Sequence, residues 1–172
     1  GEPAYIAGQA QSLGRVVAVG AVDRNGAMPT FSNRAGATAN YYLLAPGVSV
    51  ITAVVDDNIR LPNGANNDAD SDGDYWAATG TSFAAPHVAG ALALMLDLFP
   101  NITPENALLA LLESADDYVT TSPDAVLGIN AGAGTDSVGG RGILNLQRAF
   151  SPIGGPELDP ARDPQAQHRV LV

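Results

Sequence analysis

Four segments of the chain are short, mainly apolar and rich in β-branched or aromatic residues, and most are closed by turn-forming residues. Such runs are typical of strands that are buried on one or both faces of a sheet. The predicted strands cover residues 15–22, 41–45, 48–55 and 75–79. Because a long apolar helix follows the strands, the pattern favours an α/β fold in which helices cover the sheet.

The longest apolar segment predicts a helix from about Ser82 to Leu98 that is apolar nearly all round. A helix of this kind is expected to be central and buried, because no face is polar enough for water. Pro86 lies in its first turns and removes the backbone hydrogen bond to the Ser82 carbonyl. A second helix is predicted after Thr103, with Thr103 as N-cap and Pro104 as first residue.

Three segments have no apolar periodicity and are predicted to lie outside regular structure. Residues 56–74 are rich in Asp, Asn and Gly, which predicts a surface loop or a hairpin insertion. Residues 118–141 are a loop rich in Gly, Ser and Asp. From residue 151 the chain is rich in Pro and Gly, so we assign 1–150 to one domain and 151–172 to a linker or tail.

Composition narrows the classes of function. The 172 residues are 46% hydrophobic, which is enough for one globular domain with a core. The formal net charge of −10 argues against a surface for nucleic acid or anionic membrane. The sequence has no cysteine, which excludes disulfides and thiolate chemistry. No membrane span and no signal peptide are predicted.

The start of the long helix combines the features of a nucleophile and of an anion site. Ser82 follows Gly80-Thr81 and lies in the first helical turn. The backbone N–H groups there have no partner inside the helix and attract negative charge. A serine at this position is also a common N-cap residue, so the position alone does not decide between the two roles.

The segment from Gly80 to Gly90 resembles the nucleophile motif of the subtilisin-like serine proteases, Gly-Thr-Ser-x-Ala-x-Pro-His-Val-Ala-Gly, at every fixed position. Further segments are similar to the C-terminal half of that family's catalytic domain, and they follow in the family's order. They are Val16 to Asp23, Phe31 to Asn33, Ala45 to Val48, Thr103-Pro104, and Gly140 to Asn145 with Ala149. The resemblance covers roughly residues 3–150.

The resemblance implies part of a three-layer α/β fold with a mostly parallel sheet and a central helix beginning at Ser82. It implies a secreted or cell-surface serine endopeptidase with a protein or peptide substrate and no cofactor for the chemistry. Ser82 would be the nucleophile, and its backbone N–H would be half of the oxyanion hole. The family's Asp and His motifs do not occur in this chain, and no Asn precedes Val16 to supply the oxyanion side chain.

The chain alone is therefore predicted to be inactive, as a fragment of the peptidase domain. It is expected to associate with the missing N-terminal half or with another copy of itself, because its sheet would be cut beside residues 16–22. The alternative function is a non-catalytic binding or structural module with the same fold. Residues preceding Gly1 in the source gene would distinguish these two hypotheses.

Two other residues near the motif could take part in the chemistry, and both have a simpler interpretation. His87 lies five positions after Ser82, away from the helical face that carries Ser82. We interpret His87 as structural, and His168, in the Pro-rich tail, as solvated. Asp23 follows a strand at a position that is not catalytic in the family, and is interpreted as a turn residue.

The acidic segment offers a calcium hypothesis. Asp68, Asp70, Asp72 and Asp74 alternate with other residues, and a glycine stands at the sixth position, as in the first half of an EF-hand loop. Thr79 occupies the twelfth position, where that loop has a Glu. The alternatives are a structural calcium ion and a solvated acidic hairpin.

Overall fold

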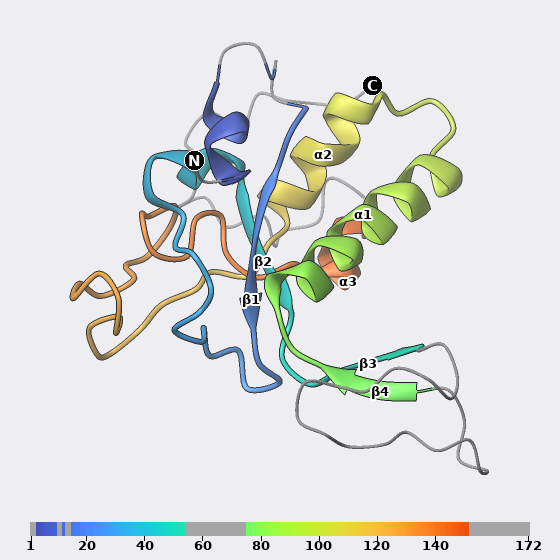
Figure 1. Cartoon of the computed structure of the whole chain (residues 1–172). Coiled ribbons are helices and arrows are strands. Elements are labelled where there is room, and N and C mark those ends of the chain that lie inside the picture. Colours follow the sequence, from blue (N-terminus) through green and yellow to red (C-terminus); the bar gives the residue numbers. More distant parts are fainter. Residues whose placement is uncertain (1–2, 10–11, 13–14, 54–74, 152–172) are drawn as a thin grey trace, which may run out of the picture.

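A two-stranded parallel sheet, a projecting hairpin and one long helix organise the residues that this computed structural model describes, which are 3–9, 12, 15–53 and 75–151. The elements, in chain order, are η1 (Pro3–Gly8), β1 (Ala18–Val22), η3 (Gly36–Tyr41), β2 (Tyr42–Pro46), β3 (Val50–Ala53), β4 (Tyr75–Ala78), α1 (Thr81–Leu98), α2 (Pro104–Glu113) and α3 (Leu146–Ala149). Figure 1 shows their arrangement. All four predicted strands and both long helices are confirmed, whereas η1 and η3 were not predicted.

Strands β1 and β2 pair in parallel and carry the core on both faces. Their register aligns Ala18 with Tyr42 and Val22 with Pro46. Leu43 and Ala45 point into a cluster with α1 and α2, while Tyr42 and Leu44 point into a second cluster that includes Ala7 of η1. This burial on both faces explains why these strands are apolar runs without alternation.

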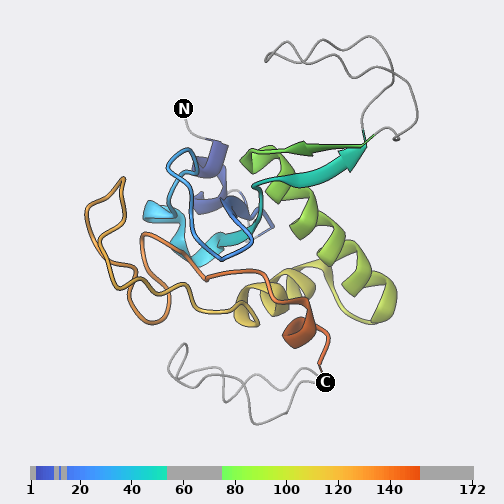
Figure 2. The ribbon, with the colours of Figure 1, turned by 90° about the horizontal axis from the view of Figure 1, so that it is seen from below.

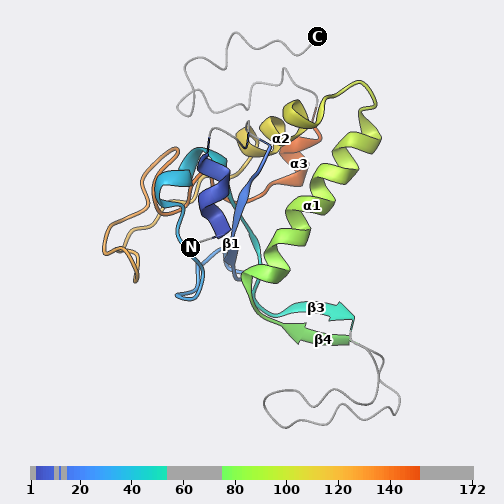
Figure 3. The same ribbon diagram turned by 45° about the horizontal axis from the view of Figure 1, so that its top comes forward.

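Strands β3 and β4 form a separate antiparallel hairpin that projects away from the core (Figure 3). Val50 pairs with Ala78, and Ala53 pairs with Tyr75. Ala78 is buried at the base, while Ile51 and Tyr75 are exposed. The chain passes from β4 into α1 within a few residues, so the base of the hairpin positions the start of the helix.

Helix α1 is confirmed in position but is buried on one face only. Its buried residues recur every three or four positions and are Ala84, Val88, Ala91 and Met95. They pack against β1, β2 and α2, whereas Leu94 and Leu98 on other faces are 52% and 60% exposed. The expectation of a central, buried helix is therefore wrong for the described residues, because their strands and α2 cover only one side (Figure 2).

By length and composition α1 also resembles a membrane span. Its Ala and Val face packs on the sheet, and Pro86 interrupts its backbone hydrogen bonds. Packing of this kind is what a helix makes on the sheet of a globular domain, so we interpret α1 as such a helix, covered on one side in the described chain.

The predicted cap of α2 is present, and α3 has a side-chain cap that was not predicted. The Thr103 hydroxyl accepts a hydrogen bond from the Asn106 N–H at 3.2 Å, and Pro104 is the first residue of α2. Asn145 caps α3 by accepting from the Arg148 N–H at 2.9 Å. The tail predicted for 151–172 lies outside the described residues, apart from Ser151.

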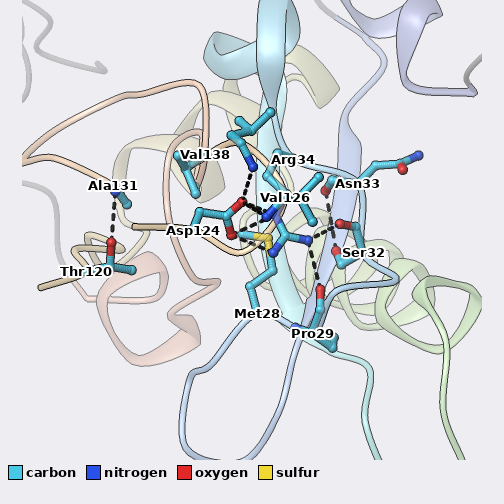
Figure 4. Close-up of polar contacts among 12 residues, drawn as sticks. Met28, Pro29, Ser32, Asn33, Arg34, Thr120, Asp124, Val126, Ala131 and Val138 are labelled. Carbon is cyan, nitrogen blue, oxygen red and sulfur yellow. Dashed lines mark hydrogen bonds and ion pairs between the residues drawn. The ribbon is translucent and has the colours of Figure 1, made fainter. Parts of the chain in front are cut away.

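A buried ion pair joins two loops that are distant in sequence (Figure 4). Arg34 donates from Nε to both Asp124 oxygens at 2.9 Å, and the two side chains are 3% and 5% exposed. The other side of the guanidinium donates to the carbonyls of Pro29 and Ser32. Asp124 also accepts the Val126 N–H at 3.0 Å. Both charges are thus paired and hydrogen-bonded, the condition under which burial of charge is tolerated.

The same region contains a buried tyrosine hydroxyl. Tyr42 is 1% exposed and donates to the Asn33 carbonyl. Burial raises the pKa of Tyr42 to about 12, so the hydroxyl stays protonated and remains a donor across the accessible pH range. The loop of Ser32, Asn33 and Arg34 is therefore bound to β2 as well as to Asp124.

Replacing Asp124 by Asn is expected to lower the free energy of unfolding by about 3–5 kcal/mol, because the Arg34 charge stays buried without a counter-charge. The matched control is Asp97→Asn, which removes the same charge at an exposed position of α1 and should change stability by less than about 0.5 kcal/mol. Urea denaturation monitored by circular dichroism measures both. Equal midpoints for the two variants would contradict this account of the ion pair.

The ion pair between Arg34 and Asp124 also predicts that the protein loses stability in acid. The Arg34 guanidinium, which hydrogen-bonds to Asp124, holds the pKa of that carboxyl below its usual value. The resulting stability is fully present above the unfolded pKa of about 3.9 and is lost as the pH falls through the lower folded pKa. Below pH 4, the difference in unfolding free energy between wild type and Asp124→Asn should therefore shrink; a difference that stays constant would exclude this linkage.

Candidate active site

Ser82 is exposed and lies in the first turn of α1, at the end of the parallel sheet where the strands have their carboxyl termini. The Val22 carbonyl, the last of β1, accepts a hydrogen bond from the Gly47 N–H at 3.0 Å. The Gly47 carbonyl then accepts from the Gly80 N–H at 2.8 Å. Two successive backbone contacts thus connect the end of the sheet to the residue that precedes the helix.

Gly47 is in close contact with the helix start and leaves no space for a side chain. A Cβ on Gly47 would lie 2.6 Å from the Ala21 Cβ, 3.0 Å from the Gly80 carbonyl oxygen and 3.2 Å from the Ala84 Cβ. Ala84 itself is fully buried, two residues after Ser82. The position of Ser82 is therefore determined by small residues that let the helix, the sheet and the turn approach closely.

The backbone before Ser82 is restrained in a conformation that requires glycine. Gly80 has φ 157° and ψ 157°, a region that is nearly exclusive to glycine. The preceding Thr79 accepts the Ser49 N–H through its hydroxyl at 3.0 Å, and Ser49 has a positive φ of 53°. This side-chain contact joins the two strands of the hairpin at its base, directly beside the serine loop.

The N-terminus of α1 leaves backbone donors directed away from the helix. The Phe83 N–H is bonded to the Gly80 carbonyl at 3.0 Å, but no side chain caps the terminus and the first turn holds no acidic residue. The N–H of Ser82 is one of the first four in the helix and has no intrahelical acceptor. The helix dipole makes this terminus favourable for a negative charge.

His87 is exposed and bonded within its own helix. Its Nδ1 lies 2.7 Å from the Phe83 carbonyl oxygen. A carbonyl oxygen only accepts, so Nδ1 must carry the proton in this contact. This arrangement agrees with the structural role expected for His87, because it directs Nδ1 toward the backbone of its own helix.

Asp23 is likewise occupied by its own turn. One carboxylate oxygen accepts the N–H groups of Asn25 at 2.8 Å and Ala27 at 2.9 Å. These are the contacts of a turn residue, as predicted. Neither Asp23 nor His87 hydrogen-bonds to the Ser82 hydroxyl, and the described residues contain no other histidine.

The calcium candidates Asp68, Asp70, Asp72 and Asp74 lie outside the described residues. Within the described part of the chain no three His, Asp or Glu side chains gather as a metal site would require. Sequence reasoning matched Ala45 to Val48 to a family turn but missed that Gly47 contacts the serine loop. A Pro-Gly pair after a buried strand signals a turn, but it does not reveal the partner of that turn.

Comparison with known proteins agrees with this geometry. Residues 2–142 match the subtilase family, which is most of the chain. This chain belongs to the subtilase family. Curated relatives of this subtilase include Subtilisin E of Bacillus subtilis, 34% identical over 134 residues, and an extracellular serine protease of Serratia marcescens, 30% identical over 133 residues. These alignments cover 77% and 74% of the subtilase chain, but 26% and 11% of the relatives.

Solved structures show the same fold. The prenylagaramide maturation protease PagA matches with a TM-score of 0.55 and 30% identity, over 78% of this chain and 41% of that one. Fervidolysin from Fervidobacterium pennivorans matches with a TM-score of 0.56 and 27% identity, over 84% of this chain and 20% of that one. The resemblance to subtilisin-like proteases is thus confirmed, and the chain spans less than half of the length of these relatives.

Replacing Gly47 by Ala is expected to lower the free energy of unfolding by about 1–3 kcal/mol, because the new methyl group meets backbone and buried Cβ atoms. Gly90→Ala is the matched control: nothing lies within 4 Å of its added Cβ, and alanine favours the helix by about 1 kcal/mol. Urea denaturation should move the two midpoints in opposite directions. A stabilised Gly47→Ala variant would contradict the close contact described above.

Proposed function

We propose that this chain supplies the nucleophile of a subtilisin-type serine endopeptidase and half of its oxyanion hole. The observation that supports this proposal is an exposed serine in the first turn of an uncapped helix, held there by the contacts of Gly47 and Gly80. The match of residues 2–142 to the subtilase family supports hydrolysis of a peptide bond as the reaction. The substrate is a peptide bond in a protein or peptide, and the chemistry needs no cofactor.

In the proposed reaction the Ser82 oxygen attacks the carbonyl carbon of the scissile peptide bond. A hydroxyl is a weak nucleophile, so an imidazole must take its proton as the bond forms. The negative charge that develops on the carbonyl oxygen is stabilised by the Ser82 N–H and by the dipole of α1. The proton is then given to the leaving amine, and water releases the acyl group from Ser82.

We also propose that the chain is inactive by itself. His87 is bound to its own helix, Asp23 to its own turn, and no Asn precedes the first strand. In subtilisin itself, loss of the catalytic His lowers kcat by about 10⁶. Loss of the oxyanion Asn lowers it by about 10²–10³. Either loss alone is sufficient to remove useful activity.

A second polypeptide region is needed to complete the enzyme, and the exposed face of α1 is where we place it. Leu94 and Leu98 are large, apolar and more than half exposed. Relatives are several times longer than the matched segment, so they contain further chain that can cover such a face. By analogy with the extracellular protease of Serratia marcescens, we propose that the complete enzyme is secreted.

The purified chain is expected to hydrolyse a fluorogenic peptide no faster than its Ser82→Ala variant, because no base activates the hydroxyl. Ser82→Ala is the matched control, since it removes only an exposed oxygen. Hydrolysis that the wild-type chain shows and the Ser82→Ala variant lacks would falsify the proposed inactivity, although it would support Ser82 as nucleophile. The non-catalytic alternative is favoured if no N-terminal half of a subtilase restores hydrolysis.

We also propose a structural calcium ion at the acidic segment, as its carboxylate spacing suggests. Calorimetric titration of the chain with calcium should give a saturable heat that an Asp70→Asn, Asp72→Asn double variant loses. The Asp116→Asn, Asp136→Asn double variant controls for net charge. No binding heat at millimolar calcium would remove this proposal.

A further inference from the structure

An asparagine that precedes a glycine lies just after β1 and takes no part in the site described above. Asn25 and Gly26 follow the strand within a few residues, and Asn25 is exposed. Its side-chain amide forms no hydrogen bond with the described part of the chain. Asparagine is one of the chemically labile residues, and a following glycine has no side chain that shields its own backbone nitrogen. The pair is therefore open to reaction.

The reaction open to this pair is deamidation through a succinimide. The Gly26 backbone nitrogen forms a bond to the Asn25 side-chain carbon Cγ and loses its proton. The C–N bond of the side-chain amide breaks, and the nitrogen leaves with that proton as ammonia. Water then opens the five-membered ring at either carbonyl, which gives aspartate or isoaspartate at residue 25. Water is the one co-reactant, and no group is oxidised or reduced.

The turn holds the attacking nitrogen in a different contact. The Gly26 N–H donates to the Asp23 carbonyl at 3.0 Å, and the Asp23 N–H donates to the Ala27 carbonyl at 2.9 Å. Ring closure requires the Gly26 nitrogen to give up the hydrogen that this bond uses. The turn must therefore open before the succinimide can form, so local opening limits the rate.

The Asp23 carboxylate stabilises the closed turn. One of its oxygens accepts the N–H groups of Asn25 at 2.8 Å and Ala27 at 2.9 Å, on the two sides of Gly26. Hydrogen bonds to a charged acceptor are stronger than those between neutral groups. Gly26 itself has a φ of 78°, a left-handed conformation that favours glycine. The residue that the turn requires is thus also the one that makes Asn25 reactive.

We propose that Asn25 is a deamidation site and that the turn held by Asp23 controls its rate. Deamidation is slow while the turn is closed and fast when the turn opens. Isoaspartate inserts one more carbon atom into the main chain between residues 25 and 26, so the modified turn loses the spacing of its hydrogen bonds. Ser82 takes no part in this chemistry, and the proposal does not rest on the peptidase function.

Incubation in mildly alkaline buffer, followed by peptide mapping with mass spectrometry, tests the site on the unmodified chain. Mapping separates Asn25 from Asn63, the other asparagine that precedes a glycine. Deamidation of Asn25 in the folded chain should be about tenfold or more slower than in the same chain unfolded in urea, because the turn must open first. Equal rates would overturn control by the turn, and no deamidation of Asn25 in urea would overturn the site itself.

Variants of Asp23 test the role of its carboxylate. Asp23→Ala removes both side-chain hydrogen bonds and should raise the deamidation rate of Asn25 about tenfold or more. Asp23→Asn keeps an acceptor oxygen and should stay within about threefold of wild type. Asp136→Ala is the matched control, because Asp136 accepts backbone N–H groups in another loop, and it should stay within about twofold. An unchanged rate in Asp23→Ala, or an equal rise in Asp136→Ala, would overturn the role of Asp23.

Discussion

The contact between Gly47 and Gly80 is the constraint on which the rest of this structure depends. The Val22 carbonyl binds Gly47, Gly47 binds Gly80, and Ala84 fills the space beneath them. The parallel sheet thereby determines where α1 begins. Only residues without a side chain, or with the smallest one, permit this approach, and that explains the Gly and Ala content around Ser82.

Contacts farther from Ser82 stabilise this arrangement of the sheet and α1. Arg34 and Asp124 bind the loop after β1 to the long loop before α3, and the Ser32 hydroxyl of the same loop binds Ala21 in β1. One face of α1 is packed on the strands and α2. Its other face lacks such contacts in the described chain. The described residues thus fix the position of Ser82, while Asp23 and His87 bond to backbone groups of their own turn and helix.

The sequence was sufficient to predict the strands, both long helices, the Thr103 cap of α2 and the position of Ser82. Local sequence patterns are enough to predict these features. They are the apolar run of β1, the Thr103-Pro104 start of α2 and the serine motif. The structure was needed for contacts between distant segments, such as Arg34 with Asp124 or Gly47 with Gly80, because no local pattern encodes them. The burial of α1 was overestimated for a related reason, since an apolar composition shows what a helix could bury but not what covers it.

Covalent labelling of Ser82 tests the central claim, that this chain holds a subtilase nucleophile without its base. A fluorophosphonate probe reacts efficiently with a serine that a neighbouring general base activates, and mass spectrometry of the peptide that contains Ser82 detects the adduct. No adduct is expected on the chain alone, and an adduct on Ser82 is expected after addition of a polypeptide that carries the Asp and His segments of a subtilase. An adduct on Ser82 in the isolated chain would contradict this claim.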